Sequence, residues 1–250
     1  MFGEGDRTSR LIRAELFKAR ASRVTWILVA LAPLLCVLWA GLMVATAESG
    51  GATAPQIENV YNMAQQCYVF ALILGVLGMA GENRHRTITW QFLVTPRRER
   101  VVRAKLAAYG IVGLLIGAVS ALVTLAAGLV MLGLAGHPVW TPRVPVVLLG
   151  SVLSVVLYGL LGVGLGVLLR NQVAAVAVAL AWFMYADYLL TMLLPGLGRW
   201  LPTGAARALG GMNMQDGELL PAWGGGLLFA GYVVVIVLAA RALTLRRDIT

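Results

Sequence analysis

Six long runs of apolar residues constrain this chain more than any other feature. Each run is close to the roughly 20 residues that a helix needs to cross the hydrocarbon core of a bilayer. The runs span 24–47, 63–80, 106–134, 144–169, 173–194 and 223–240. None alternates like a β-strand, so helices are expected rather than a barrel. The predicted fold class is an all-α integral membrane protein, with six transmembrane helices in a single transmembrane domain covering 1–250.

The composition supports a membrane environment. Hydrophobic residues make up 60% of the chain and charged residues only 12%, whereas soluble domains carry about 45–50% and about 25%. A soluble domain of this size could not bury so much apolar surface. Arg far outnumbers Lys, and Ala, Gly, Val and Leu abound, which is typical of a GC-rich bacterial genome. We therefore predict a multi-pass protein of the bacterial inner (plasma) membrane.

The distribution of positive charge predicts the orientation. All but Arg143, Arg199 and Arg207 of the 20 Lys and Arg residues lie before the first run, after the second, after the fourth or in the tail. Cytoplasmic loops are enriched in Lys and Arg, so both termini are expected in the cytoplasm. The net charge of +9 then suits anionic headgroups rather than nucleic acid.

Two segments outside the runs have features of their own. In residues 1–23, Leu11, Ile12, Leu16 and Ala19 recur at helical spacing among basic residues. This pattern predicts an amphipathic interfacial helix on the inner membrane surface; the alternative is a solvated basic tail. The outer segment 196–222 holds short apolar pieces between Pro and Gly, and we expect one or two short re-entrant helices there.

The sequence carries no pattern typical of an enzyme. The two histidines, His85 and His137, are expected on opposite faces of the membrane and cannot share a site. No HExxH, GxSxG or phosphate-binding GxxxxGK[ST] is present. We therefore predict a transport subunit rather than an enzyme, with no catalytic residue, metal or cofactor bound by this chain.

Polar and aromatic residues in the second and fifth runs are candidates for a substrate path. Asp187 is an ionisable residue inside the fifth run, and such residues commonly mark function. It could contact substrate or a partner helix, but a structural role near outer-leaflet water or beside Arg199 is favoured. The candidate path residues are Met63, Gln66, Tyr68, Phe70, Phe183, Tyr185, Asp187 and Tyr188. Core packing or lipid contact is the alternative for each of them.

The segment between the second and third runs is short, cationic and aromatic. Residues 81–105 read GENRHRTITWQFLVTPRRERVVRAK. The alternation in TITWQF is compatible with a strand. As a helix, its apolar residues would spread around most of the circumference, which favours an element held in a groove over one lying on a membrane. Periodicity alone does not decide between the two.

With this segment and the RAELFKAR stretch before the first run, the chain resembles permease subunits of ATP-binding-cassette (ABC) exporters of the type-2 family, of the actinobacterial kind. In many bacterial members the loop reads as an acid, a basic pair, Thr-Ile, a short apolar piece, Thr-Pro and an Arg-rich run before Lys-Leu. The matching positions here are Glu82, Arg84, Thr87, Ile88, Leu93, Thr95, Pro96, Arg97, Lys105 and Leu106. Many members have Gly where Arg86 stands.

The resemblance implies a G-subfamily-like (type V) exporter fold, in which 82–105 is a cytoplasmic coupling loop. Residues 87–94 would form a coupling helix seated in a separate ABC ATPase subunit, and Glu82 would orient the bundle near it. The residues implied in coupling are Glu82, Arg84, Thr87, Ile88, Trp90, Phe92, Leu93 and Pro96. ATP and Mg would be bound by the ATPase, and two permease copies, identical or different, would pair around a path lined by the second and fifth runs.

The function expected from the resemblance is export of a lipophilic or amphipathic compound, such as an antibiotic, a peptide or a lipid. Antibiotic resistance by multidrug efflux belongs to this expectation. The alternative is a secondary transporter or channel without an ATPase partner. That alternative would favour internal repeats or several buried charges, and the sequence shows neither.

Overall fold

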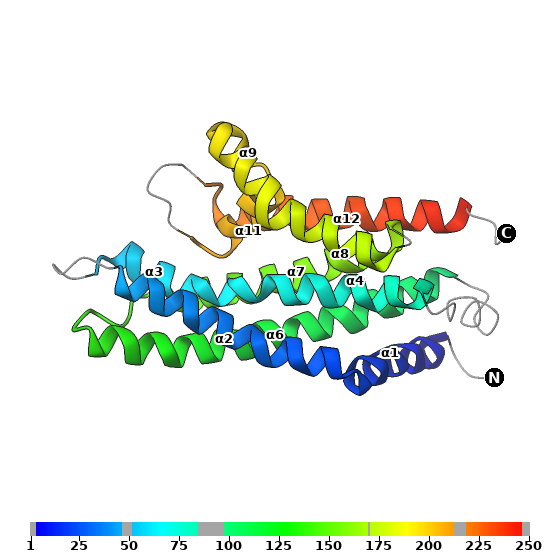
Figure 1. Cartoon of the computed structure of the whole chain (residues 1–250), viewed down its shortest axis with the longest axis horizontal. Coiled ribbons are helices and arrows are strands. Elements are labelled where there is room, and N and C mark those ends of the chain that lie inside the picture. Colours follow the sequence, from blue (N-terminus) through cyan, green and yellow to red (C-terminus); the bar gives the residue numbers. More distant parts are fainter. Residues whose placement is uncertain (1–3, 47–51, 85–97, 170, 213–218, 247–250) are drawn as a thin grey trace.

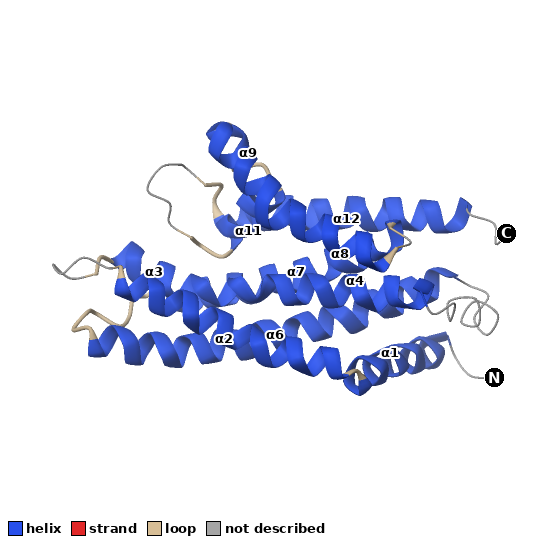
Figure 2. Ribbon diagram, viewed as in Figure 1, coloured by secondary structure: helices blue, strands red, loops and turns tan. Residues whose placement is uncertain are grey.

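Every regular element of the computed structural model is helical within the described residues, 4–46, 52–84, 98–169, 171–212 and 219–246 (Figure 2). The N-terminal half comprises α1 (Glu4–Ala21), α2 (Arg23–Ala45), α3 (Ala54–Asn62), the 3-10 turn η1 (Met63–Cys67), α4 (Tyr68–Arg84) and α6 (Arg98–Leu134). The C-terminal half comprises α7 (Val144–Leu168), α8 (Gln172–Leu180), the π-helical turn η2 (Ala181–Ala186), α9 (Asp187–Leu193), α10 (Pro195–Gly198), α11 (Pro202–Leu209) and α12 (Ala222–Arg246). The all-α prediction is confirmed.

Six helical segments in the described part of the chain are long and apolar enough to cross a membrane. They are Arg23–Ala45, Ala54–Ala80, Arg100–Leu134, Val144–Leu168, Gln172–Leu193 and Ala222–Ala240. The prediction of six transmembrane helices is confirmed. Helix α1 and the last turns of α12 lie at the same end of the bundle, together with the last turn of α4 and the first turn of α6 (Figure 1). This arrangement is the one that the charge distribution predicts for a cytoplasmic side.

The second membrane helix begins earlier than the predicted start at Met63. Helix α3 starts at Ala54, where Thr53 and Gln56 form a capping box, with the Thr53 N–H donating to Gln56 Oε1 at 2.8 Å. The polar side chains of α3 are typical of a loop when read from the sequence alone. In the fold the buried Glu58 has partners, since the Thr141 hydroxyl donates to it at 3.2 Å and Arg143 Nη1 lies 3.4 Å from the same carboxylate.

The third membrane helix also begins before its predicted start at Leu106. Helix α6 starts at Arg98, so the last residues of the predicted coupling loop 82–105 are helical. The physical reason is burial: Val101, Val102 and Ala104 are all buried. In the sequence these three apolar residues stand among several Arg residues, so the sequence predicts an apolar run that begins only at Leu106.

Helix α7 lies at the centre of the bundle, packed against α4, α6 and α12. Glycines permit the closest of these approaches. A Cβ on Gly162 would collide with the backbone carbonyl of Leu72 in α4, and a Cβ on Gly75 would collide with that of Gly159 in α7. Small residues commonly line helix contacts in membranes because no hydrophobic force drives helices together there. The main chains of α4 and α7 are therefore in direct contact.

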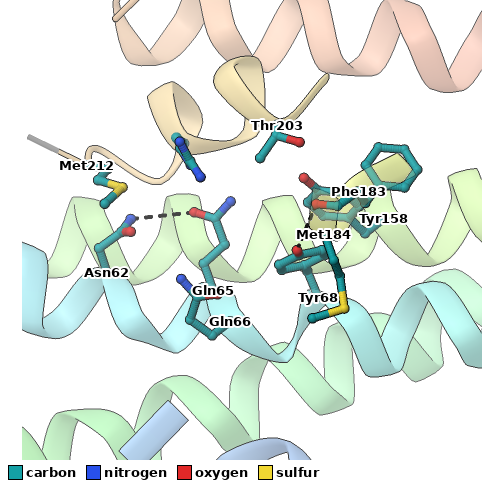
Figure 3. A pocket seen from close by; sticks show the side chains of 10 residues that line it. Asn62, Gln65, Gln66, Tyr68, Tyr158, Phe183, Met184, Thr203 and Met212 are labelled. Atoms are coloured by element: carbon teal, nitrogen blue, oxygen red, sulfur yellow. Dashed lines mark hydrogen bonds between the residues drawn. The ribbon is translucent and has the colours of Figure 1, made fainter. Parts of the chain in front are cut away.

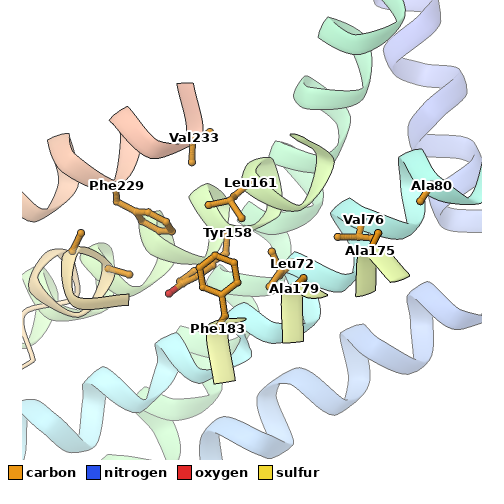
Figure 4. Close-up of a cluster of buried hydrophobic side chains, with 12 residues drawn as sticks. Leu72, Val76, Ala80, Tyr158, Leu161, Ala175, Ala179, Phe183, Phe229 and Val233 are labelled. Atoms are coloured by element: carbon orange, nitrogen blue, oxygen red, sulfur yellow. The ribbon is translucent and has the colours of Figure 1, made fainter. Parts of the chain in front are cut away.

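A cluster of buried aromatic and aliphatic side chains joins α4, α7, α8, η2 and α12 (Figure 4). At its centre the Tyr158 ring lies 4.4 Å from Tyr68, 5.5 Å from Phe183 and 4.7 Å from Phe229, measured between ring centroids. Offset and edge-to-face pairs of this kind add about 0.5–1.5 kcal/mol each beyond their burial. Tyr158 in α7 therefore contacts side chains from three other membrane helices.

The N-terminal segment 1–23 contains the predicted helix, and one of its faces packs against the bundle. Ala19 is buried and Leu16 packs with it against residues of α2, α4 and α6. Phe17, by contrast, is 73% exposed. The amphipathic helix is thus present, while its contact with the membrane surface stays a prediction.

Two short helices, α10 and α11, occupy the first part of the predicted outer segment 196–222. Pro195 and Pro202 each stand in the first turn of their helix, where a missing N–H costs nothing. Helix α11 packs mainly against α12, and it lies towards the end of the bundle opposite the termini (Figure 1). Re-entry of these helices into the membrane stays a prediction.

Candidate functional site

A buried ion pair joins three helices at the end of the bundle that holds the termini. Lys105 Nζ in α6 lies 2.7 Å from Glu15 Oε2 in α1 and donates to the carbonyl of Gly78 in α4 at 3.0 Å. Lys105 is fully buried and Glu15 is 4% exposed. Lys18 Nζ contacts the other oxygen of Glu15 at 2.8 Å. This cluster, which we call the Glu15–Lys105 junction, joins α4 and α6, the two helices that precede and follow residues 85–97 in the chain.

Charge keeps Glu15 ionised despite its burial. Burial raises the pKa of its carboxyl group, but the ammonium groups of Lys105 and Lys18 outweigh burial, and the net pKa lies below its usual value. Gly78 makes the geometry possible because any Cβ there would overlap the ring of Tyr109 in α6. The close approach lets Lys105 reach a backbone carbonyl, which leaves the buried ammonium group with two oxygen acceptors.

A cavity of about 130 Å³ lies in the other half of the bundle, between α4, α7, η2 and α11 (Figure 3). Its lining combines amide, aromatic, thioether and guanidinium side chains. The residues are Asn62, Gln65, Gln66, Tyr68, Tyr158, Phe183, Met184, Thr203, Arg207 and Met212. Irregular turns border it on two sides, because Gln65 and Gln66 come from η1 and Phe183 and Met184 from η2. Such turns commonly occur at functional positions in helices.

The amide wall of the cavity is held by the segment that follows α11. Asn62 Nδ2 donates to the backbone carbonyl of Gly210 at 2.7 Å and to Gln65 Oε1 at 3.5 Å. A Cβ on Gly210 would collide with both amide side chains. Gly210 therefore fixes the spacing between the second membrane helix and α11.

Asp187 lies behind the cavity and caps the first turn of α11. The fully buried carboxylate accepts a hydrogen bond from the Thr203 N–H at 3.0 Å and a second from the Thr203 hydroxyl, both on Oδ2. A carboxylate at a helix N-terminus meets free N–H groups and the positive end of the helix dipole. Oδ1 has no hydrogen-bond partner in the described part of the chain.

Arg207 stands one helical turn beyond Thr203 on α11 and lines the cavity. Its side chain is half-buried. The guanidinium group makes no hydrogen bond or ion pair with the residues described here. Within the described part of the chain, no carboxylate contacts this cationic group at the cavity.

The comparison with known families identifies the chain. The sequence model of one family, described as ABC-2 family transporter protein, matches residues 11–187, which is most of the chain. The chain belongs to the ABC-2 transporter family. A search of curated proteins finds no match. The family and the six apolar helices together make this a multi-pass membrane protein and a permease of an ABC transporter, a transport subunit rather than a catalytic one.

Most of the coupling residues implied for an ABC-2 permease fall outside the described residues. Those residues are Thr87, Ile88, Trp90, Phe92, Leu93 and Pro96. The backbones of Glu82 and Arg84 belong to the last turn of α4. The role of the whole set stays a prediction.

The predicted path residues of this ABC-2 protein separate into two groups. Gln66, Tyr68 and Phe183 line the cavity, with Asp187 bonded to Thr203 beside it. Three others lie elsewhere: Met63 is buried in a separate core cluster, Phe70 packs towards α2 and α6, and Tyr185 is 72% exposed. Tyr188 falls within α9, and its role stays a prediction. Asp187 does not pair with Arg199, whose guanidinium carbon lies 5.6 Å from the Trp200 ring centroid.

Sequence reasoning missed several residues that the fold brings together. Tyr158, Thr203 and Arg207 line the cavity from elements that periodicity does not connect to the second and fifth helices. Glu15 and Lys105 were assigned to separate basic segments. One signal was available for Glu15, which stands on the same helical face as Ile12 and Ala19 and so predicts a buried acid in need of a cation.

Proposed function

We propose that this ABC-2 permease exports a lipophilic or amphipathic compound from the bacterial cell, using ATP hydrolysed by a separate ABC ATPase subunit. The family match carries the proposal. The sequence contains no GxxxxGK[ST] phosphate-binding motif, so we assign ATP and Mg²⁺ to the partner chain. Apolar and aromatic residues in the cavity lining favour an amphipathic substrate over a small ion.

The route from ATPase to membrane passes through residues 85–97. A helix of residues 87–94, seated in a cleft of the ATPase, would move with it when ATP draws two ATPase subunits together. The Glu15–Lys105 junction supports this route because it joins α1 to α4 and α6, the two helices to which the segment is connected in the chain. A displacement of the segment would then move α1, α4 and α6 together instead of bending one of these helices.

Two permease copies would pack together, each with one ATPase. The second and fifth membrane helices of each copy would face a shared path. The exposed large apolar side chains of η2 and α9, including Tyr185, Met192 and Leu193, are compatible with contact to a second permease as well as to lipid. Multidrug efflux with antibiotic resistance is the cellular role that this arrangement would serve.

Co-purification and transport test the proposal. The permease and its ATPase are expected to form a complex whose ATP hydrolysis is stimulated by the permease in proteoliposomes. Truncation of Trp90 and Phe92 together to Ala should reduce both complex formation and transport by about tenfold or more, since large aromatic side chains dominate such contacts. The matched control is Trp223→Ala with Leu227→Ala, two exposed apolar side chains on α12.

Normal assembly and transport by the Trp90/Phe92 variant would contradict the coupling assignment. Transport driven by an ion gradient without any ATPase would instead favour the alternative, a secondary transporter or channel. Both outcomes are read from the same proteoliposome assay, with ATP and the ion gradient supplied separately.

A further inference from the structure

The cavity is lined by a positive charge that no described carboxylate contacts. Arg207 lines it, and the guanidinium group contacts no carboxylate among the described residues. A charged side chain within a membrane protein is costly unless it is paired or functional. Five N–H donors in a planar fork suit carboxylate and phosphate oxygens. An anionic ligand in the cavity would supply the contact that no described residue makes with Arg207.

The nearest buried carboxylate is already engaged elsewhere. Asp187 Oδ2 accepts hydrogen bonds from the backbone N–H and the hydroxyl group of Thr203, in the first turn of α11. Its negative charge is balanced there by the helix N-terminus. Arg207 stands one turn further along the same helix, and no ion pair joins it to Asp187.

The remaining lining has two different characters. In the wall formed by Asn62, Gln65 and Gln66, the amide groups of Gln65 and Gln66 can donate hydrogen bonds to an anion. Asn62 holds Gln65 in place, since its N–H groups already donate to Gly210 and Gln65. The wall formed by Tyr68, Phe183 and Met184 offers aromatic rings and a thioether, which suit an apolar tail. A ligand that satisfies both walls has a polar, negatively charged end and an apolar end.

The volume of the cavity suits the headgroup of an amphipathic molecule. A bound water needs about 10–15 Å³ on the same kind of measure, so about 130 Å³ holds a group of several heavy atoms but not an entire lipid. We propose that this cavity takes the anionic headgroup, a carboxylate or a phosphate, of an amphipathic molecule, and that Arg207 is the residue that selects the charge. The inference rests on the proposed function only in treating the cavity as part of the substrate path.

The test compares probes that share one tail and differ in the headgroup. Dodecanoate, dodecyl phosphate, dodecanol and dodecyltrimethylammonium are titrated onto the full-length permease in phosphatidylcholine nanodiscs, without ATPase, and dissociation constants are measured. The two anionic probes, or one of them, should bind at least about tenfold more tightly than the neutral and cationic probes, since hydrogen bonds to a charged group contribute about 1.5–3 kcal/mol. A preference for phosphate alone, or for both anions, identifies the headgroup.

Variants assign the preference to Arg207. Arg207→Gln should abolish the difference between anionic and neutral probes, while Arg207→Lys should retain part of it because the charge remains. Arg199→Gln is the control, since Arg199 lies over Trp200 and does not line the cavity. Equal affinity of the wild type for all four headgroups would overturn the proposal, whatever the variants do. So would an unchanged preference in Arg207→Gln with a normal melting temperature.

Inorganic phosphate and acetate serve as competitors without a tail. Weak competition supports an amphipathic ligand, whereas competition as strong as that of the dodecyl probes would overturn the amphipathic part of the proposal. Because the measurement needs no ATPase, its outcome is independent of the coupling experiment. A permease that stimulates its ATPase but shows no headgroup preference refutes this inference alone, and the reverse result refutes the proposed coupling alone.

Discussion

Lys105 Nζ and Glu15 Oε2, 90 residues apart in the chain, lie 2.7 Å from each other inside the bundle. Taking both charges out of water is costly, and the attraction between them offsets that cost only while both partners are present. A buried pair of this kind therefore contributes more to the relative position of α1 and α6 than to net stability.

Removing one partner of this pair should be much worse than removing both. Lys105→Met removes the ammonium group that lies 2.7 Å from the buried Glu15 carboxylate, and we expect a loss of about 3 kcal/mol or more in the free energy of unfolding. Glu15→Gln combined with Lys105→Met should recover most of that loss. A double-mutant cycle from denaturation in detergent checks this, and simple additivity of the two single losses would contradict the proposed coupling.

The same ion pair should make the stability of the protein depend on pH in the acidic range. The pKa of Glu15 is lowered from its ordinary value of 4.5, so its contribution is fully present above that value and is lost as the pH falls through the folded-state pKa. The melting temperature of the wild type should therefore fall more steeply below about pH 4.5 than that of Glu15→Gln. Other carboxyl groups titrate in both proteins, so the difference between the two curves isolates Glu15. Parallel curves would show that Glu15 is not held ionised.

The contact between α4 and α7 predicts a strong position dependence for glycine replacement. Gly162→Ala places a methyl group against the carbonyl of Leu72, and overpacking of this kind costs about 1–3 kcal/mol. Gly231→Ala in α12 is the matched control, because its Cβ would meet nothing within 4 Å. That control should be neutral or stabilising by about 0.4–1 kcal/mol. Equal melting temperatures for the two variants would argue against the close approach.

Asp187 should act through the position of α11. Asp187→Ala removes the cap and leaves the Thr203 N–H without its acceptor, which should lower stability by about 1–2 kcal/mol. Asp187→Asn keeps an acceptor oxygen, so it should cost less and leave transport of the tested substrates unchanged. Thermal unfolding and a proteoliposome transport assay measure the two effects. Loss of transport in a stable Asp187→Asn variant would instead assign the charge a direct role.

The sequence predicted the six membrane helices and the common side of the termini because apolar run length and Lys/Arg placement act locally and strongly. It placed the start of the second helix at Met63 rather than Ala54, since Glu58 and Asn62 are polar in sequence but paired in the fold. It could not connect Arg207 or Tyr158 with Gln66. These residues line one cavity because of the path of α11 across the bundle, which no short-range pattern encodes.

The backbone contact between α4 and α7 limits how this protein can change shape. A slide of α4 along α7 by a single residue would bring a side chain against a peptide carbonyl where a glycine now stands. The two helices therefore share one allowed register, and a push on α4 from the cytoplasmic end must carry α7 along without slippage. We therefore expect any opening of a path to involve α9 rather than a slide of α4 on α7, since side chains of α9 such as Leu189 and Met192 are exposed.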